Sequence, residues 1–168
     1  VFSFLLNLVF FCQDIAAKND TLKALFFGNS FTGYNNMPGI VSAIASSVGD
    51  SLIIDGYGLG GYTLSNHCQD SNTLSKIMQN GWDYVVLQEQ SQLPALPTSQ
   101  FMTGVFPFAH KLDSLINESN PCGETVFYMT WGRKNGLDSG SCASWPPVCT
   151  YNSMDSIIHL NYMRMADS

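Results

Sequence analysis

Short apolar runs alternate along the chain with longer segments in which apolar residues recur every three or four positions. The apolar runs predict buried strands at 23–27, 51–58, 83–88 and 124–131. The periodic segments predict helices at 37–49, 72–81, 98–119 and 152–166. Continuously apolar strands that alternate with helices indicate a parallel sheet covered on both faces. The predicted fold class is therefore α/β, with three α/β/α layers around a doubly wound, mainly parallel sheet.

Proline and glycine refine the predicted helix boundaries. Pro38 lies in the first turn of the segment 37–49, and Gly49 is expected to end it. Pro107 lies inside the segment 98–119, and it is expected to bend or divide that helix because proline cannot donate the backbone hydrogen bond.

Length and charge limit the classes of protein to consider. The 168 residues, 45% hydrophobic and 12% charged, suit one domain with a substantial core, and no linker or internal repeat divides them. Seven basic residues against 13 acidic ones give a formal net charge of -6. The chain lacks the positive field that phosphate backbones attract, so nucleic acid is not expected as a partner.

The first residues predict export. "VFSFLLNLVFF" is too short to span a bilayer and precedes a pair of small residues, which is typical of a secretory signal peptide over 1–17. A buried strand or helix is the alternative reading. Export leaves one domain over 18–168 and a secreted location, and sequons at Asn19 and Asn117 suit a glycoprotein. Because no initiating methionine or basic start is present, the chain is expected to be a fragment at its front end.

Cysteine usage agrees with an extracellular location. Cleavage of the leader discards Cys12 and leaves an even number of cysteines with three possible pairings. No CxxC pair or histidine-rich spacing favours zinc, so disulfides are predicted and no metal is expected. The disulfide candidates are Cys68, Cys122, Cys142 and Cys149.

Polar and glycine residues follow each predicted strand at its carboxyl end, where open parallel sheets bind ligands. These residues are Gly28, Asn29 and Ser30; Gly60, Gly61, Tyr62 and Thr63; Gln88, Glu89, Gln90 and Ser91; and Thr130, Trp131, Gly132 and Arg133. A serine on a tight turn after a buried strand exposes its hydroxyl, which suits a nucleophile. Glycine amides and a carboxamide from the neighbouring loops could complete an oxyanion hole. A plain polar turn is the simpler alternative for the tripeptide alone.

The blocks "FFGNSFTGYNNMPG", "LGGYTLSNH" and "WDYVVLQEQSQLP", followed by "YMTWGR", resemble the SGNH-hydrolase superfamily of GDSL-like esterases. They are most similar to a secreted branch with Gly-Asn-Ser and Leu-Gln-Glu-Gln-Ser signatures. The resemblance covers residues 23–133 and implies a flavodoxin-like SGNH fold. It also implies that Ser30 is the nucleophile and Gly61 the second oxyanion donor. The usual Gly-x-Asn-Asp block is replaced here, so the third donor falls on Gln88, Gln90 or Gln92, of which we predict Gln90.

A second departure concerns the catalytic base. The family carries Asp-x-x-His near the C-terminus of its domain, and no such motif occurs here. For His67 we consider a substrate contact and favour a capping or surface role, and we interpret His110 as structural. His159 lacks an aspartate three positions earlier. The domain is therefore expected to be incomplete at its C-terminus, and the fragment to be nearly inactive, since a serine hydroxyl needs a base.

The resemblance implies an extracellular hydrolase that transfers an acyl group to Ser30, with an acetyl ester of a carbohydrate as the substrate class. No cofactor is expected. Candidate substrate contacts are Asn29, Tyr62, Trp131 and Arg133. Two other classes stay open: a non-catalytic carbohydrate-binding protein on the same scaffold, and a flavodoxin-like phosphate or flavin binder that uses "GNSFTG" as its phosphate loop.

Overall fold

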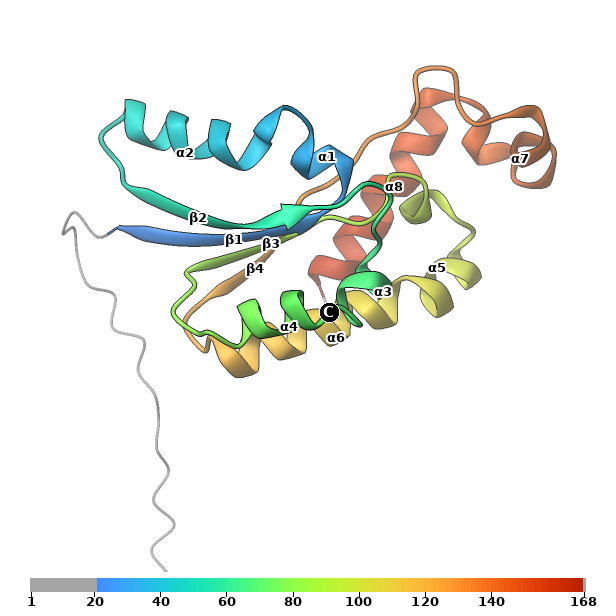
Figure 1. The fold of residues 1–168 in the computed structure, drawn as a ribbon. Helices are drawn as coiled ribbons and strands as arrows, with labels where there is room; N and C mark the ends of the chain where they lie inside the picture. Colours follow the sequence, from blue (N-terminus) through green and yellow to red (C-terminus); the bar gives the residue numbers. More distant parts are fainter. Residues whose placement is uncertain (1–20, 168) are drawn as a thin grey trace, which may run out of the picture.

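The computed structural model describes residues 21–167, and its centre is one four-stranded parallel sheet (Figure 1). The strands stand in the order β2-β1-β3-β4, so the first strand lies inside the sheet. Their bounds are β1 Leu22–Gly28, β2 Leu52–Gly58, β3 Tyr84–Leu87 and β4 Glu124–Phe127. Phe27 pairs with both Tyr57 and Leu87, which sets the carboxyl ends of three strands at one edge of the sheet. The predicted α/β class with a parallel sheet is confirmed.

Helices cover both faces of this sheet, as Figure 1 shows. One face carries α1 Ser30–Gly33, a short 3-10 turn at Tyr34–Asn36 and α2 Met37–Ser47. The remaining helices are α3 Leu64–His67, α4 Ser71–Ile77, α5 Thr98–Gly104, α6 Phe106–Ser119, α7 Ser139–Ser144 and α8 Tyr151–Ala166, with 3-10 turns at Leu93–Ala95 and Pro146–Cys149. The predicted helix at 98–119 is divided into α5 and α6 around Val105, next to Pro107, as its proline indicated.

The main core lies between the sheet and the pair α6 and α8. Strand side chains from alternate positions of β1 and β3 point into it and contact apolar residues of both helices. Its fully buried members include Leu25, Phe27, Val85, Leu87, Leu112, Ile116 and Ile158. Phe27 and Leu87, near the carboxyl ends of β1 and β3, are therefore anchored in this core.

The opposite face of the sheet is less well covered. The apolar stripe of α2 was predicted from its periodicity, yet no residue of α2 is buried, and Ile44 and Val48 are 62% and 73% exposed. An apolar groove of about 680 Å³ runs between α2 and the sheet, lined among others by Phe26, Val41 and Val86. The described residues therefore leave part of this face open.

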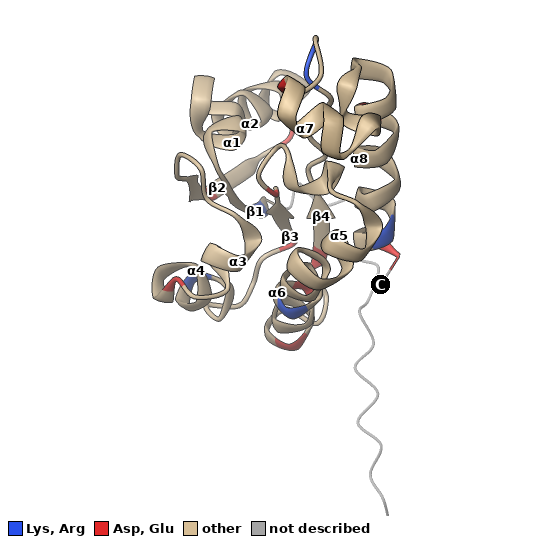
Figure 2. Cartoon of the chain, turned by 90° about the vertical axis from the view of Figure 1, so that its right-hand side faces the viewer, with Lys and Arg blue, Asp and Glu red and all other residues tan. Residues whose placement is uncertain are grey.

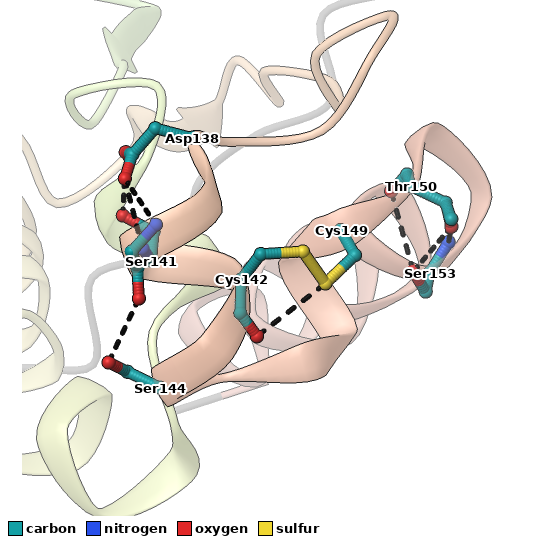
Figure 3. The surroundings of a disulfide bond; sticks show 8 residues. Asp138, Ser141, Cys142, Ser144, Cys149, Thr150 and Ser153 are labelled. Carbon is teal, nitrogen blue, oxygen red and sulfur yellow. Dashed lines mark hydrogen bonds between the residues drawn. A yellow bond between two sulfur atoms is a disulfide. The ribbon is translucent and has the colours of Figure 1, made fainter.

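The long segment after β4 is folded and cross-linked rather than irregular. A disulfide joins Cys142 of α7 to Cys149, with 5.0 Å between their Cα atoms, and Asp138 caps α7 through the N–H groups of Gly140 and Ser141 (Figure 3). The predicted disulfide role of Cys142 and Cys149 is thus confirmed, and Cys122 is also disulfide-bonded.

The prediction of a disulfide at Cys68 is wrong. Cys68 is a free thiol, 4% exposed, and its Sγ faces the carbonyl oxygen of Phe108 at 3.5 Å. It packs in the core because α3 places it against α6, and a buried cysteine there behaves as a small apolar side chain.

The predicted signal peptide at 1–17 and the sequon at Asn19 lie outside the described residues. The sequon residue Asn117 is exposed on α6. Over residues 21–167, no helix has the length and apolar character needed to cross a membrane. In the view of Figure 2 the charged residues are few and scattered over helices and loops. The expected absence of a nucleic-acid partner stays a prediction.

Candidate active site

The turn that carries Ser30 begins where β1 ends. Asn29 is the N-cap of α1, and its Oδ1 accepts a hydrogen bond from the N–H of Phe31 at 3.1 Å. Ser30 is the first residue of α1 and is exposed. A Cβ on Gly28 would lie 2.2 Å from Thr32 Oγ1 and 2.6 Å from the Gln88 side chain, so only glycine fits at the end of the strand.

Buried hydrogen bonds join the Ser30 turn to the two neighbouring loops. Asn29 is 2% exposed, and its Nδ2 donates to the Tyr62 carbonyl oxygen at 3.0 Å. Its backbone N–H donates to Gln88 Oε1 at 3.1 Å, and Thr32 Oγ1 donates to the same oxygen at 2.8 Å. The loops after β1, β2 and β3 are therefore fixed to one another through buried side chains rather than through solvent.

Glu89 links the loops after β2 and β3 directly. Its carboxylate accepts the N–H of Leu64 at 3.2 Å and the N–H of Gln90 at 2.5 Å, and the side chain is 1% exposed. Burial raises the pKa of the Glu89 carboxyl to about 7, although the two backbone hydrogen bonds oppose that rise. The sequence analysis placed Glu89 at the rim without a role, because the sequence alone does not show that its side chain points inward.

Among the rim N–H donors without a partner in residues 21–167 are the three that the sequence predicted for an oxyanion hole. They are the backbone N–H of Ser30, the backbone N–H of Gly61 and the side-chain Nε2 of Gln90. Gly61 has φ +75°, a backbone conformation that favours glycine, and the residue is exposed.

Gln88 and Gln90, two of the candidates for the third oxyanion donor, differ in the hydrogen bonds of their side-chain amides. Gln88 is fully buried, its oxygen accepts from the Ser30 turn and its Nε2 donates to the Glu89 carbonyl oxygen. Gln90 is only half-buried, its Oε1 accepts the N–H of Gln92, and its amide hydrogens are free. The geometry thus favours Gln90 over Gln88 as a donor to a ligand.

A cavity of about 400 Å³ opens beside Ser30 and has aromatic walls. Phe31, Tyr34, Asn35 and Trp131 line it together with Ser30. The rings of Phe31 and Trp131 are tilted, with their centres 4.8 Å apart, and Tyr34 and Trp131 are 76% and 49% exposed. Exposed aromatic faces next to a hydroxyl suit a ligand with an apolar or sugar-ring surface. Tyr34 was missed from the sequence because it lies on a short turn rather than at a strand end.

The loop after β4 is held by α8. The N–H of Gly132 donates to Asp155 Oδ1 at 3.0 Å, and the N–H of Arg133 faces Met154 Sδ at 3.5 Å. With the Gln92 amide turned so that its oxygen faces Arg133, that oxygen accepts from Nη1 at 3.0 Å. The Arg133 side chain is exposed and donates hydrogen bonds to Gln92. Trp131, in contrast, lines the cavity beside Ser30.

The predicted substrate contacts Asn29 and Tyr62 occupy different surroundings. Both side-chain groups of Asn29 are used inside the protein, while Tyr62 is half-buried with its ring 5.1 Å from the His67 ring. Their contact with a substrate stays a prediction. Through these hydrogen bonds, the Asn29 side chain joins the loop after β1 to the loop after β2.

None of the three histidines, all within residues 21–167, forms a hydrogen bond with the Ser30 hydroxyl. His110 and His159 are exposed on α6 and α8. His67 is fully buried, and both of its ring nitrogens already have partners, namely the Gly28 carbonyl oxygen and Thr73 Oγ1. The predicted capping or surface role of His67 is wrong, because α3 turns the ring inward beneath the end of β1.

Solved structures share this fold. A protein from Slackia heliotrinireducens assigned to the SGNH hydrolases matches with a TM-score of 0.65 and 22% identity, over 88% of this chain and 75% of that one. The psychrotrophic esterase EstA from Pseudoalteromonas sp., solved with monoethylphosphonate as inhibitor, matches with a TM-score of 0.53 and 9% identity, over 86% and 72%. No protein-family model and no curated protein sequence matches the chain.

The chain has the SGNH-hydrolase fold. In this SGNH-hydrolase fold, the Ser30 turn, the Gly61 loop and the Gln90 loop follow β1, β2 and β3, at the edge where parallel sheets bind ligands. The predicted flavodoxin-like arrangement is confirmed for the described residues.

Proposed function

We propose that the chain is a serine ester hydrolase with Ser30 as its nucleophile. One observation carries the proposal: exposed Ser30 lies on a turn that hydrogen-bonds directly to the neighbouring loop after β2 and to Gln88 after β3, and the unpartnered donors Gly61 N–H and Gln90 Nε2 belong to those loops. The fold supports it, because the solved structures of this fold include an esterase. Fold alone does not specify a reaction, so the argument depends on the site.

The reaction proceeds by acyl transfer. Ser30 Oγ forms a bond to the ester carbonyl carbon while its proton passes to a base, and the carbonyl electron pair moves onto oxygen. The N–H groups of Ser30, Gly61 and Gln90 hold this oxyanion. Collapse of the intermediate breaks the bond to the alcohol, which leaves with the proton. Water then attacks the acyl group on Ser30 and releases the acid.

The base is the part that residues 21–167 do not supply in a recognisable form. Both His67 nitrogens are engaged, and His110 and His159 are exposed on helices. We therefore propose slow hydrolysis by the 168-residue chain itself, since a serine without a base is a weak nucleophile.

The aromatic cavity beside Ser30 supports the substrate class that the resemblance implies. We propose an ester of a carbohydrate, with a small acyl group such as acetyl at Ser30 and the sugar against Tyr34 and Trp131. A secreted location accompanies this proposal. It is supported by the Cys142–Cys149 disulfide, since disulfides persist in oxidising compartments.

Labelling of the nucleophile tests the proposal. A fluorophosphonate should add one phosphonyl group to Ser30, detectable by mass spectrometry of the digested protein, and p-nitrophenyl acetate should be hydrolysed above the buffer rate. Ser30→Ala should abolish both signals. The matched control is Ser75→Ala, which removes an exposed hydroxyl on α4 and should leave both unchanged. Equal labelling of wild type and Ser30→Ala would exclude Ser30 as nucleophile.

The aromatic cavity also favours a second candidate function. A non-catalytic carbohydrate-binding protein would use Tyr34 and Trp131 in the same way and would need no base. It predicts that Ser30→Ala binds acetylated sugars as tightly as wild type, while neither protein reacts with the fluorophosphonate.

A further inference from the structure

A chain of four polar contacts leads away from the Ser30 turn. His67 Nε2 lies 3.0 Å from the Gly28 carbonyl oxygen, and His67 Nδ1 lies 3.0 Å from Thr73 Oγ1. Thr73 Oγ1 lies 2.6 Å from the Tyr57 hydroxyl, which donates to Asp70 Oδ2 at 2.9 Å. The chain thus connects the last residue of β1 to the N-cap of α4.

The middle of this chain is sealed from water. His67 and Thr73 have no exposed surface, and the His67 ring is surrounded by the rings of Phe27, Tyr57 and Tyr62 at 5.1–5.9 Å between centres. A buried ring nitrogen that loses a protein partner therefore has no water to replace it, which makes the loss expensive.

The directions of these hydrogen bonds follow from counting hydrogens. The Gly28 carbonyl and the Asp70 carboxylate at the two ends can only accept. Four contacts need four hydrogens. Neutral His67, Thr73 and Tyr57 supply one each, so one of the four contacts lacks a hydrogen while the ring is neutral. The bond to Gly28 requires the hydrogen of neutral His67 to be on Nε2. A fourth proton on the ring would complete the chain without breaking the bond to Gly28.

We propose that His67 is a positioning residue for the nucleophile: its Nε2–H holds the Gly28 carbonyl, and the buried Thr73 hydroxyl, which donates to Nδ1, fixes the ring for that bond. Gly28 immediately precedes Asn29 and Ser30, so a displaced carbonyl would turn the peptide that leads to the nucleophile. The role rests on the proposed function only in that Ser30 is the group positioned.

In the described part of the chain, the titratable groups around the His67 ring are one aspartate and two tyrosines. Asp70, at the start of α4, is the charged group that acts on the ring among residues 21–167, and Tyr57 of β2 and Tyr62 of the next loop are the phenols that face it. Burial lowers the pKa of His67 and so favours the neutral ring, and in a neutral ring the bond to Gly28 places the hydrogen on Nε2.

The first experiment uses the whole chain and requires no activity. Nitrogen-15 NMR of histidine-labelled protein at pH 8 should show one ring with Nε2 protonated and Nδ1 bare, and that ring should disappear from the spectrum of His67→Gln. An Nδ1–H tautomer at His67 would overturn the proposal, because the bond to Gly28 could not then exist.

The second experiment separates local positioning from general stability. His67→Phe should speed hydrogen exchange of the Phe31, Thr32 and Gly33 amides by about tenfold or more relative to the amides of β3, since one lost buried bond releases the turn. His67→Gln keeps an N–H donor and should restore most of the protection. The control Ile116→Ala removes a fully buried side chain of α6 and should lower stability without this local excess.

The outcomes distinguish the two proposals. Turn amides that exchange no faster in His67→Phe than in Ile116→Ala would overturn the positioning role, as would a failure of His67→Gln to restore them. If His67→Phe does not fold, the tautomer measurement and His67→Gln still decide. Fluorophosphonate labelling of Ser30 should fall at least tenfold in His67→Phe and recover in His67→Gln. Absence of labelling in wild type would reject the proposed function while leaving the exchange and tautomer results valid.

Discussion

The backbone N–H of Asn29 donates a hydrogen bond to the buried side-chain oxygen of Gln88 at 3.1 Å. This contact fixes the residue before the nucleophile to the loop after β3, and it uses an oxygen that also accepts from Thr32. Gln88 is therefore part of the frame of the site, whereas Gln90, two residues later, has a free amide at the rim.

Substitution of these two glutamines should have opposite effects. Gln88→Ala leaves the Asn29 N–H and the Thr32 hydroxyl without their acceptor, and should lower the free energy of unfolding by roughly 1–3 kcal/mol for each group in urea titrations. Gln90→Ala should leave that free energy unchanged and slow phosphonylation of Ser30 on the order of 100-fold to 1000-fold, because an oxyanion donor is lost. A slow but stable Gln88→Ala, together with an unaffected Gln90→Ala, would reverse the assignment.

Much of this frame could be predicted because it depends on local patterns. Apolar runs give the strands, and the carboxyl ends of parallel strands share an edge, so Ser30, Gly61 and the glutamines were expected at the same edge of the sheet. Gln90 was predicted, but the structural reason why its amide rather than that of Gln88 is free could not be, since it depends on where the hydrogen bonds between β1 and β3 end. Gln88 still donates its N–H to Phe27 and so points its side chain inward.

The surroundings of His67 and Cys68 depend on tertiary packing, which the local sequence does not reveal. The polar stretch around His67 looks like a surface turn, yet α3 turns its ring beneath β1. Cys68 is one of an even number of cysteines, but pairing requires proximity, and its sulfur lies in the core against α6.

The aromatic cavity should determine affinity rather than rate. Trp131→Ala and Tyr34→Ala remove ring surface beside Ser30, and each should weaken binding of a carbohydrate ester by a few-fold to about tenfold. The labelling rate with a small fluorophosphonate should stay within about twofold of wild type. Leu160→Ala is the matched control, because this residue of α8 is also 49% exposed and does not line the cavity. Calorimetric titration would measure the affinities, and equal losses in the control would show that the cavity walls are not a binding surface.

The thiol of Cys68 should be inert in the folded protein. It is buried, and burial raises its pKa to about 11, so almost none of the reactive thiolate exists at pH 8. Iodoacetamide should leave the Cys68 peptide unmodified in native protein and modify it within minutes in urea, as read by peptide mapping. Mild reduction should expose Cys142 and Cys149 while leaving Cys68 protected. Modification of Cys68 in native protein at the rate of a free thiol would contradict its packing against α6.

Glu89 should make stability depend on pH in a direction opposite to that of an ordinary carboxylate. Its pKa is raised from 4.5 to about 7, so between these values the unfolded chain releases a proton that the folded chain keeps. The contribution of Glu89 to the free energy of unfolding is therefore fully present below about pH 4.5. It falls by about 3 kcal/mol as pH rises to about 7. His67 acts in the opposite direction, because its pKa is lowered and its contribution is lost as pH falls below 6.5. The two slopes oppose each other in wild type, so the difference between wild type and Glu89→Gln is the informative quantity. That difference, measured by urea titration from pH 4.5 to 8, should shift against wild type as pH rises, and a constant difference would mean that Glu89 ionises in the folded protein as it does in water.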